Sequence, residues 1–482
     1  MADGHSHPPA TLTYLGHACI LVEIGGARIL MDPWLVGPSN GNGWWHLPAA
    51  AATPESLGSV DYVMISHVRN DHFHIPSLKR LPKTATVMVP YGLDPWMANA
   101  LREIGFNRVT EIEHGQTQHL PGDISVENYQ HGRIDSAYWL QHGNETILNL
   151  NDCPTPDWWL REWLCHHPPP DVALSAFSYA SPFPVCYDVR GKNREHLLSE
   201  NVARVLDQFA RTMGMLQPRF AVPFATQYGF FLPGCRWMTS NIPTPQAALD
   251  TLSSRHPNVG SALLNPGDRL SVRDGKTVTG RSFDWDARER ELDSEIEMRA
   301  DGINKAIAEE EQLPPDCFER FAFYFEGIIS KNWVLRRKLP NRIAFVTEPE
   351  DEWWTLDCTR RRDFASRSEV ADVSLQIRLP RALLSAALEG QIHWETLYLS
   401  NRLHITVDKD DLDSEWQFWR MLFNFPEGIL RDRLRLFSTR GRRVLRRRYP
   451  ELLRLVRERI ARSSNREPYV DANSDSTSER SI

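Results

Sequence analysis

Short apolar runs separated by turn residues dominate the first 266 residues of this chain of 482. The segments "DYVMIS", "ATVMVP" and "FAVPF" are nearly continuous apolar runs of the kind that form buried strands. Helical patterns such as "WMANALREIG" and "ENVARVLDQFARTMGML" lie between them. Buried strands that alternate with helices predict a layered α/β fold with the helices on the outside.

Two longer stretches predict strand pairs. "TLTYLGHACILVEIGGARILMD" predicts two strands around a turn at Gly25 and Gly26. "YWLQHGNETILNL" predicts a hairpin that turns at Gly143 and Asn144.

The composition changes after about residue 284, where "DARERELDSEIEMRADGINKAIAEEEQL" is charged and helical in pattern. Strand-like and helix-like segments then alternate, and the last residues have almost nothing to bury. We therefore predict a first domain at residues 11–281, a helical linker at 282–312, a mixed α+β domain at 313–426, an arginine-rich helical segment at 427–462 and a disordered tail at 463–482.

The arginine-rich segment carries apolar residues on one helical face, namely Leu452, Leu453, Val456 and Ile460. A basic amphipathic helix can dock on an acidic partner, an anionic membrane or nucleic acid. We expect it instead to pack on its own protein. Pro450 predicts that the segment is not one continuous helix.

Composition excludes several classes of protein. The formal net charge is −7, with both signs spread along the chain, so we expect no nucleic-acid partner. No apolar run is long enough to span a membrane, and the N-terminus lacks the features of a signal peptide. The seven scattered cysteines form no disulfide framework, so we expect a cytoplasmic protein.

A cluster of potential metal ligands follows the predicted strand "DYVMIS". His67, Asp71 and His72 lie within six residues of one another, in a loop at the end of that strand. Histidine suits zinc or iron, and aspartate supplies an oxygen ligand. His131, in "NYQHGRID", and Asp152, in "LNLNDC", also follow predicted strands. We favour a metal site over a surface loop with incidental histidines because matching partners occur elsewhere in the same region.

These stretches resemble the metallo-β-lactamase superfamily, whose loop reads H-x-H-x-D-H after a strand. The segments "YLGHACILVEIGGARILMDPWLVGP", "GWWHLP", "DYVMISHVRNDHFHIPSLKRL", "ILNLNDC" and "WETLYLSNRL" are most similar to the metallo-β-lactamase-like part of CMP-N-acetylneuraminic acid hydroxylases. The resemblance covers roughly residues 11–425. It implies an αββα sandwich with a C-terminal mixed α+β domain.

The resemblance also implies roles for individual residues. Asp32, in "MDPW", matches an aspartate that supports the metal loop from behind the ligands. His17, in "GHA", matches a cleft residue with a possible catalytic part, although a core histidine is equally expected. The implied metal ligands are His67, Asp71, His72, His131 and Asp152.

The chain departs from the superfamily pattern at two places. Arg69 stands where the loop has its second histidine, and a guanidinium cannot bind a metal. It adds a positive charge unless it pairs with a carboxylate, and it could hold an anionic group of a substrate. No histidine follows "FAVPF" closely, where the superfamily usually has its last ligand; Gln227 and Tyr228 are the polar candidates there.

Three outcomes follow for the site. A subset of the ligands could hold one metal ion, and two histidines with one carboxylate would suit ferrous iron. Two ions could remain, with water or substrate in the gaps. Alternatively, the site is inactive and the fold serves as a binding protein.

The resemblance favours an iron-dependent oxygenase, with one or two iron ions, that oxidises a small polar metabolite such as a nucleotide-linked sugar. The alternative is a hydrolase of phosphodiesters, lactones or amides, with zinc as the alternative metal and Asp71 as a base. Hydroxylases of this kind carry a Rieske module with a C-x-H and a C-x-x-H pair. The only C-x-H pair here is Cys165–His167, and no C-x-x-H pair occurs. We therefore expect electrons from a separate ferredoxin or Rieske-type protein, or from the substrate.

Aromatic residues are frequent, and most should pack in the core or between domains. Trp44 and Trp45 are candidates for substrate contact because they follow the loop after "DPWLVGP". Tyr228 and Arg69 complete the predicted substrate-binding set.

Overall fold

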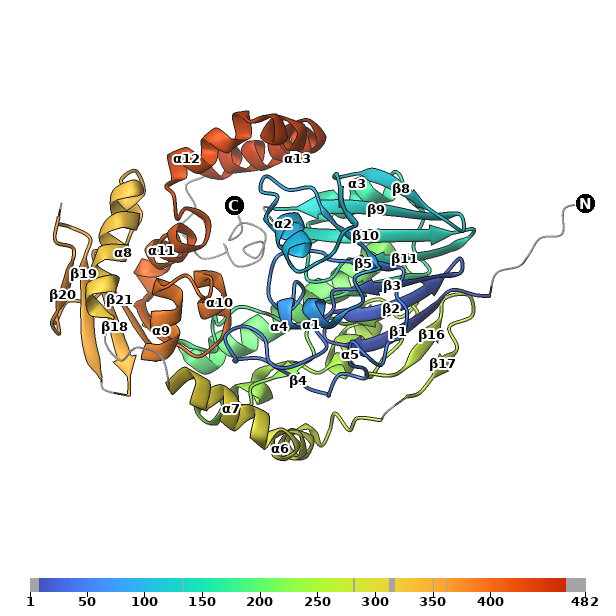
Figure 1. The fold of residues 1–482 in the computed structure, drawn as a ribbon, viewed down its shortest axis with the longest axis horizontal. Helices are drawn as coiled ribbons and strands as arrows, with labels where there is room; N and C mark the ends of the chain where they lie inside the picture. The colour runs from blue at the N-terminus through green and yellow to red at the C-terminus, as the bar shows by residue number, and fades with distance from the viewer. Residues whose placement is uncertain are drawn as a thin grey trace, which may run out of the picture.

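Two β-sheets stacked face to face form the larger part of the molecule, on the right in Figure 1. The structure, a computed structural model, describes residues 8–132, 134–280, 282–311, 317–349, 351–360 and 362–464. The first sheet has the strand order β17-β16-β1-β2-β3-β5-β6-β7. Its strands are β1 (Thr11–Gly16), β2 (Cys19–Ile24), β3 (Ala27–Met31), β5 (Tyr62–Met64), β6 (Thr86–Pro90), β7 (Val109–Ile112), β16 (Arg269–Ser271) and β17 (Thr277–Val278).

The second sheet has the order β14-β12-β11-β10-β9-β8. In the β10–β11 hairpin Leu140 pairs with Ile147, which confirms the turn predicted at Gly143 and Asn144. The strands are β8 (Gln116–Leu120), β9 (Ile124–His131), β10 (Asp135–His142), β11 (Glu145–Asn149), β12 (Val172–Ser175) and β14 (Phe220–Pro223).

Helices cover the outer face of each sheet, so the order of layers is αββα. Val22 and Tyr138 share the core between the sheets. Val87 packs with Leu101 beneath the helices of the first sheet, and Trp139 shares the core beneath those of the second. The helices are α1 (Ile75–Arg80) and α2 (Trp96–Glu103) on the first sheet, and α3 (Asp157–Leu164), α4 (Arg194–Leu216) and α5 (Pro245–Arg255) on the second.

The first predicted strand pair is in fact three strands, so that prediction is wrong in detail. Gly16, the last residue of β1, has a φ angle of +133°, and His17, in the turn to β2, has a φ angle of +49°. A histidine in the left-handed region is uncommon, and no local sequence signal marks this break. The turn places His17 at the end of the sheet where the metal loop begins.

A third sheet, with the order β13-β22-β21-β18-β19-β20, builds the C-terminal region on the left in Figure 1. Strand β13 comes from within residues 11–281, and its Tyr187 pairs in parallel with Ile405 of β22. The sheet and its helices share one core with Trp34 and Trp44 of the first region. The predicted domain boundaries stay a prediction. The elements are β13 (Tyr187–Arg190), β18 (Arg342–Glu348), β19 (Glu352–Asp357), β20 (Ala365–Arg367), β21 (Leu375–Pro380), β22 (His404–Asp408), α8 (Phe318–Lys331), α9 (Arg381–Leu388), α10 (Trp394–Leu399) and α11 (Leu412–Asn424).

The remaining helices connect or cover these two regions. No helix in the described ranges has both the length and the apolar character needed to cross a bilayer. The predicted tail lies, from residue 465 onward, outside the described residues. The remaining elements are α6 (Arg288–Met298), α7 (Ala300–Glu311), α12 (Ile429–Leu434), α13 (Thr439–Ser464) and the short pair β4 (Trp45–His46) and β15 (Tyr228–Gly229).

Helix α13 continues through Pro450, so the prediction that this proline separates two helices is wrong. A proline inside a helix removes one backbone hydrogen bond. Arg448 and Glu451 lie on either side of it and are both buried against the first region. Their long-range contacts hold the backbone helical where the local preference is to break it.

Candidate metal centre

Loops from three strand ends converge on one buried group of side chains. His67, Asp71 and His72 lie in the loop after β5, and Asp152 follows β11. His17 lies in the turn between β1 and β2. The structure thus brings these five predicted residues together, although they are up to 135 positions apart in the sequence.

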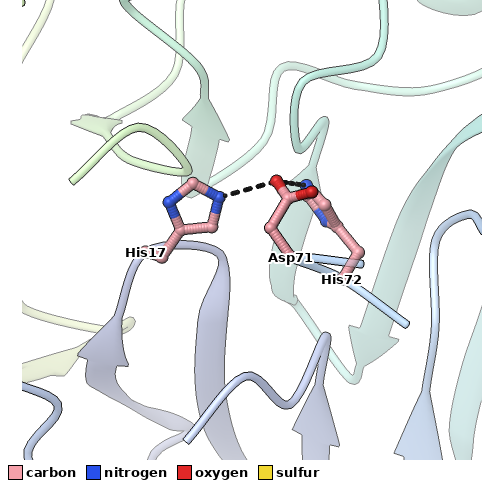
Figure 2. A group of neighbouring side chains, drawn as sticks. All are labelled: His17, Asp71 and His72. Carbon is pink, nitrogen blue, oxygen red and sulfur yellow. Dashed lines mark hydrogen bonds and ion pairs between the residues drawn. The ribbon is translucent and has the colours of Figure 1, made fainter. Parts of the chain in front are cut away.

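Two sets of three potential ligand atoms result. In one set, His67 Nε2 and His72 Nε2 each lie 3.7 Å from Asp152 Oδ1. In the other, Asp71 Oδ2 lies 3.0 Å from His17 Nε2 and 3.2 Å from His72 Nε2, as Figure 2 shows. His72 belongs to both sets.

Hydrogen bonds to Asp32 orient the two histidines of the first set. Asp32 accepts hydrogen bonds from Ser66 Oγ (2.7 Å) and from His72 Nδ1 (2.8 Å). The Ser66 hydroxyl donates its only proton to Asp32. Its oxygen therefore accepts a hydrogen bond from His67 Nδ1 (3.0 Å). Both rings therefore carry a proton on Nδ1, which leaves Nε2 free on the side of Asp152.

The first set fits a metal ion. Among the described residues, the buried atoms His67 Nε2 and Asp152 Oδ1 have no hydrogen-bond partner, and His72 Nε2 has none beyond its ion-pair contact with Asp71 Oδ2 at 3.2 Å. Unpartnered acceptors that face each other at this depth are costly, and a shared cation removes the cost. In the second set, Asp71 already accepts a hydrogen bond from His17. The hydrogen-bonding needs of this set are therefore partly met without an ion.

The protonation states agree with this arrangement. Burial lowers the pKa of His67 to about 3, so its ring is neutral at ordinary pH. Burial also disfavours a charged His72, but the carboxylates of Asp152, Asp71 and Asp32 outweigh it and raise the pKa of His72. Without a metal, His72 is the ring that gains a proton; a bound cation would take the place of that proton.

Arg69 turns toward the centre and pairs with carboxylates. Its Nη1 lies 3.0 Å from Asp152 Oδ2 and 3.5 Å from Asp135 Oδ1, and its Nε lies 3.2 Å from Glu395 Oε1. Burial disfavours its charge, but these carboxylates outweigh that effect and raise the pKa of Arg69 further. The guanidinium is thus a paired cation beside the cluster.

Asp135 and Glu395 were not predicted as site residues from the sequence. Asp135 begins β10 directly opposite His131 in the register, so the two side chains share a face of the sheet. Glu395 lies in α10, within the stretch "WETLYLSNRL" that supported the resemblance. That resemblance was the only signal that could have pointed to Glu395.

His131 belongs to neither set of three. Its Nδ1 lies 3.3 Å from Glu451 Oε1 of α13, and its Nε2 is buried without a hydrogen-bond partner. Glu451 also accepts from the backbone N–H of Gly132 (3.3 Å). The role of His131 as a ligand stays a prediction.

The predicted aromatic contact residues are buried and packed. Trp44 stacks on Tyr228 with ring centroids 4.0 Å apart, and both rings make T-shaped contacts with the ring of His17. Trp45 stacks on Phe231 at 5.6 Å. Each of these rings has an aromatic neighbour on one face. Their role in substrate binding stays a prediction.

Gln227 and Asn40 are two further buried polar residues near the cluster. Gln227 accepts a hydrogen bond from the Tyr14 hydroxyl (2.7 Å). Asn40 donates weakly to Asp71 Oδ1 (3.5 Å), and its own Oδ1 has no hydrogen-bond partner.

The two stacked sheets with helices on both outer faces have the metallo-β-lactamase type of fold. Residues 11–151 match the model of the β-lactamase superfamily domain, so this part of the chain is a domain of that superfamily. Part of the chain is similar to cytidine monophosphate-N-acetylneuraminic acid hydroxylase of Danio rerio, with 30% identity over 325 residues. That alignment covers 59% of this chain and 53% of the hydroxylase.

Two further similarities concern iron proteins. A protein of Mycobacterium tuberculosis that is named as a Rieske 2Fe-2S iron–sulfur protein is 27% identical over 274 residues, or 53% of this chain and 52% of that protein. The solved structure of CmlA, a diiron β-hydroxylase from Streptomyces venezuelae, matches with 19% identity and a TM-score of 0.38, over 57% of this chain and 55% of CmlA. The chain spans about half the length of the curated relatives that it matches.

Proposed function

We propose that this protein is an iron-dependent oxygenase that hydroxylates or otherwise oxidises a small polar metabolite. The observation that carries the proposal is the first set of three: two histidine nitrogens and one carboxylate oxygen, all buried and, within the part of the chain that the structure describes, without a hydrogen-bond partner apart from the contact of His72 with Asp71. Two histidines and one carboxylate with open positions are the ligand set of many ferrous oxygenases. The similarity to hydroxylases supports the same reading.

The residues of the chain have distinct parts in this proposal. His67, His72 and Asp152 would hold the ion, which when bound supplies the chemistry of oxygen activation. The hydrogen bonds of Ser66 and Asp32 keep the histidine Nε2 atoms facing it. Among the ligands Asp152 is the most exposed, with 13% of its side chain accessible. A substrate would therefore approach from the side of Asp152.

Hydroxylation needs an electron source. Inserting one oxygen atom of O₂ into a C–H bond consumes two electrons and two protons and releases one water. We propose that an iron–sulfur protein of the ferredoxin or Rieske type supplies the electrons. The similarity to a protein named for a Rieske centre supports this donor class.

The proposal is tested by loading protein with Fe²⁺ under anaerobic conditions. Iron bound per chain is measured first, and oxygen uptake is then followed with a reduced ferredoxin and a panel of nucleotide-linked sugars and other polar metabolites. His67→Ala should abolish both iron binding and oxygen uptake. His166→Ala, which changes an exposed histidine, is the matched control. Zinc-only binding with no iron-dependent oxygen uptake would overturn the proposal.

A metal-dependent hydrolase is the second candidate, and the position of Asp71 favours it. Asp71 Oδ2 lies 3.2 Å from His72 Nε2 and could accept a proton from a metal-bound water. Zinc-loaded protein should then cleave a generic phosphodiester or lactone, and Asp71→Ala should remove that activity. A protein that binds no metal at all would point to a non-catalytic binding role.

A further inference from the structure

The two oxygens of the Asp152 carboxylate face different groups. Oδ1 faces the Nε2 atoms of His67 and His72, where a metal ion would bind. Oδ2 lies 3.0 Å from Nη1 of Arg69. The guanidinium thus takes the place beside Asp152 in which a neighbouring ion would share the same carboxylate.

We propose that Arg69 is a resident cation that replaces a second metal ion, so that the centre binds a single ion. The inference rests on the proposed function only in that the centre binds a metal. It does not depend on whether the reaction is an oxidation or a hydrolysis.

The contacts of Arg69 are those that a buried cation requires. Asp135 is 2% exposed, and across the residues that the structure describes its Oδ1 has no hydrogen-bond partner besides the ion pair at 3.5 Å. Removing a guanidinium from between Asp135 and Asp152 would leave two buried carboxylates facing each other, which is strongly unfavourable. An arginine keeps its charge at any accessible pH, so it serves this purpose permanently.

The C-terminal region holds the guanidinium in place. Glu395 Oε1 accepts from Nε of Arg69 at 3.2 Å. Next to it, Asn70 Nδ2 donates to Thr396 Oγ1 at 3.1 Å. Because Nε and Nη1 are both engaged by carboxylates, Arg69 is fixed toward the metal centre and is not a free anion-binding side chain.

Counting bound metal ions in matched variants tests the proposal. Chelator-treated protein is titrated with Zn²⁺ alone, desalted, and the zinc per chain is measured by elemental analysis. Wild type should bind one ion. Arg69→Lys, which retains a positive charge, should also bind one. Arg69→Gln, which removes the charge and leaves the carboxylates, should bind two.

Glu395→Gln is the matched control, because it breaks the same ion pair from the carboxylate side and keeps the guanidinium. It should bind one ion. Two ions in wild type, in Arg69→Lys or in Glu395→Gln would overturn the proposal, as would one ion in Arg69→Gln. If wild type binds none, this inference and the proposed function both fail. If wild type binds one ion per chain but shows no oxygen uptake, only the proposed oxygenase function is overturned.

Thermal unfolding covers the case in which Arg69→Gln is unstable. If a cation replaces the guanidinium, excess Zn²⁺ should restore folding of Arg69→Gln and raise its Tm by more than it raises that of wild type. A variant that stays unfolded at every Zn²⁺ concentration would contradict the proposal.

Discussion

Asp32 accepts three hydrogen bonds, two from the backbone N–H and hydroxyl of Ser66 and one from His72 Nδ1. Through them it sets the proton positions on His67 and His72, although it faces neither Nε2 atom. Residues that hold metal-binding histidines in this way commonly affect metal affinity strongly. The predicted supporting role of Asp32 can therefore be tested directly.

Asp32→Asn should weaken Zn²⁺ binding by about 10–100-fold. The new amide nitrogen would face hydrogen-bond donors, and the resulting mismatch should lower the free energy of unfolding by about 1–3 kcal/mol. Competition with a chelator and urea unfolding measure the two effects. Asp61→Asn changes an exposed aspartate that accepts a single backbone hydrogen bond from Arg28, and it should leave Zn²⁺ affinity unchanged. Equal affinities in both variants would exclude the role of Asp32.

His114 lies outside the two sets of potential ligand atoms. Its protonation should make the stability of the protein depend on pH. Burial, reinforced by Arg448 and His131 and opposed by Glu451, lowers the pKa of His114 to about 4. Its Nδ1 accepts the backbone N–H of Gln130 at 2.9 Å, which requires an unprotonated nitrogen.

Between pH 6.5 and 4 the unfolded chain therefore binds a proton at His114 that the folded chain does not. The free energy of unfolding should fall as the pH drops through this window, by up to about 3 kcal/mol from this residue. His114→Asn keeps an acceptor for Gln130 and should remove most of that dependence in urea titrations at pH 7 and pH 4.5. His166→Asn, at an exposed site, should leave the slope as in wild type. Parallel slopes in all three proteins would exclude His114 as the cause.

Helix α13 is rich in arginine, yet it packs against acidic side chains of its own protein. Its arginines pair within the protein: Arg440 with Glu111, and Arg443 and Arg447 with Glu113. Arg440 also lies 4.0 Å from the ring centroid of Tyr91. The expectation that this helix packs on its own protein is confirmed for these residues, and Figure 1 shows α13 running along the edge of the first region.

The buried and exposed ion pairs of α13 should differ in their effect on stability. Glu451→Ala leaves Arg448, 9% exposed, without its carboxylate, and should lower the free energy of unfolding by about 3–5 kcal/mol. Arg443→Ala removes a partner that is 60% exposed and leaves Arg447 on Glu113, so it should cost less than about 1 kcal/mol. Urea unfolding compares them. Similar losses in both variants would mean that burial of the Arg448–Glu451 pair is not decisive.

At the scale of the whole molecule, the loop that precedes β4 joins the two regions. Glu310 of α7 pairs with both terminal nitrogens of Arg402 (2.6 and 2.7 Å) and accepts from Asn42 Nδ2 (2.7 Å). One residue further along the loop, Gly43 packs directly on Ser400. The same loop carries Asn40 to Asp71, so this junction and the candidate centre share one segment.

Gly43→Ala tests how tightly the regions fit. A Cβ at Gly43 would lie 1.9 Å from the carbonyl oxygen of Ser400, so the backbone must move. We expect a loss of at least about 2 kcal/mol in stability, measured by calorimetry, with faster proteolysis between the regions. Gly234→Ala, where the added Cβ has open space, is the control and should change little. An unaltered Tm for Gly43→Ala would mean that the two regions separate easily.

The sequence by itself determined most of the strand and helix pattern, a layered α/β class and most of the candidate ligands, while the αββα order of layers came from the family resemblance. These features depend on local periodicity and on loops of a few residues, as in the stretch from His67 to His72. Asp152 could be predicted because it lies shortly after a recognisable strand, and Asp32 because the family resemblance implies its supporting role.

Only the tertiary structure decided what surrounds those ligands. Arg69 meets Glu395 across 326 positions of sequence, and Glu451 of α13 reaches Gly132 across 319. Strand β13 joins the C-terminal sheet, and α13 continues through Pro450, for the same reason. Pairing of buried charges and strands between distant segments depends on how whole layers pack. No local pattern of apolar and polar residues carries that information.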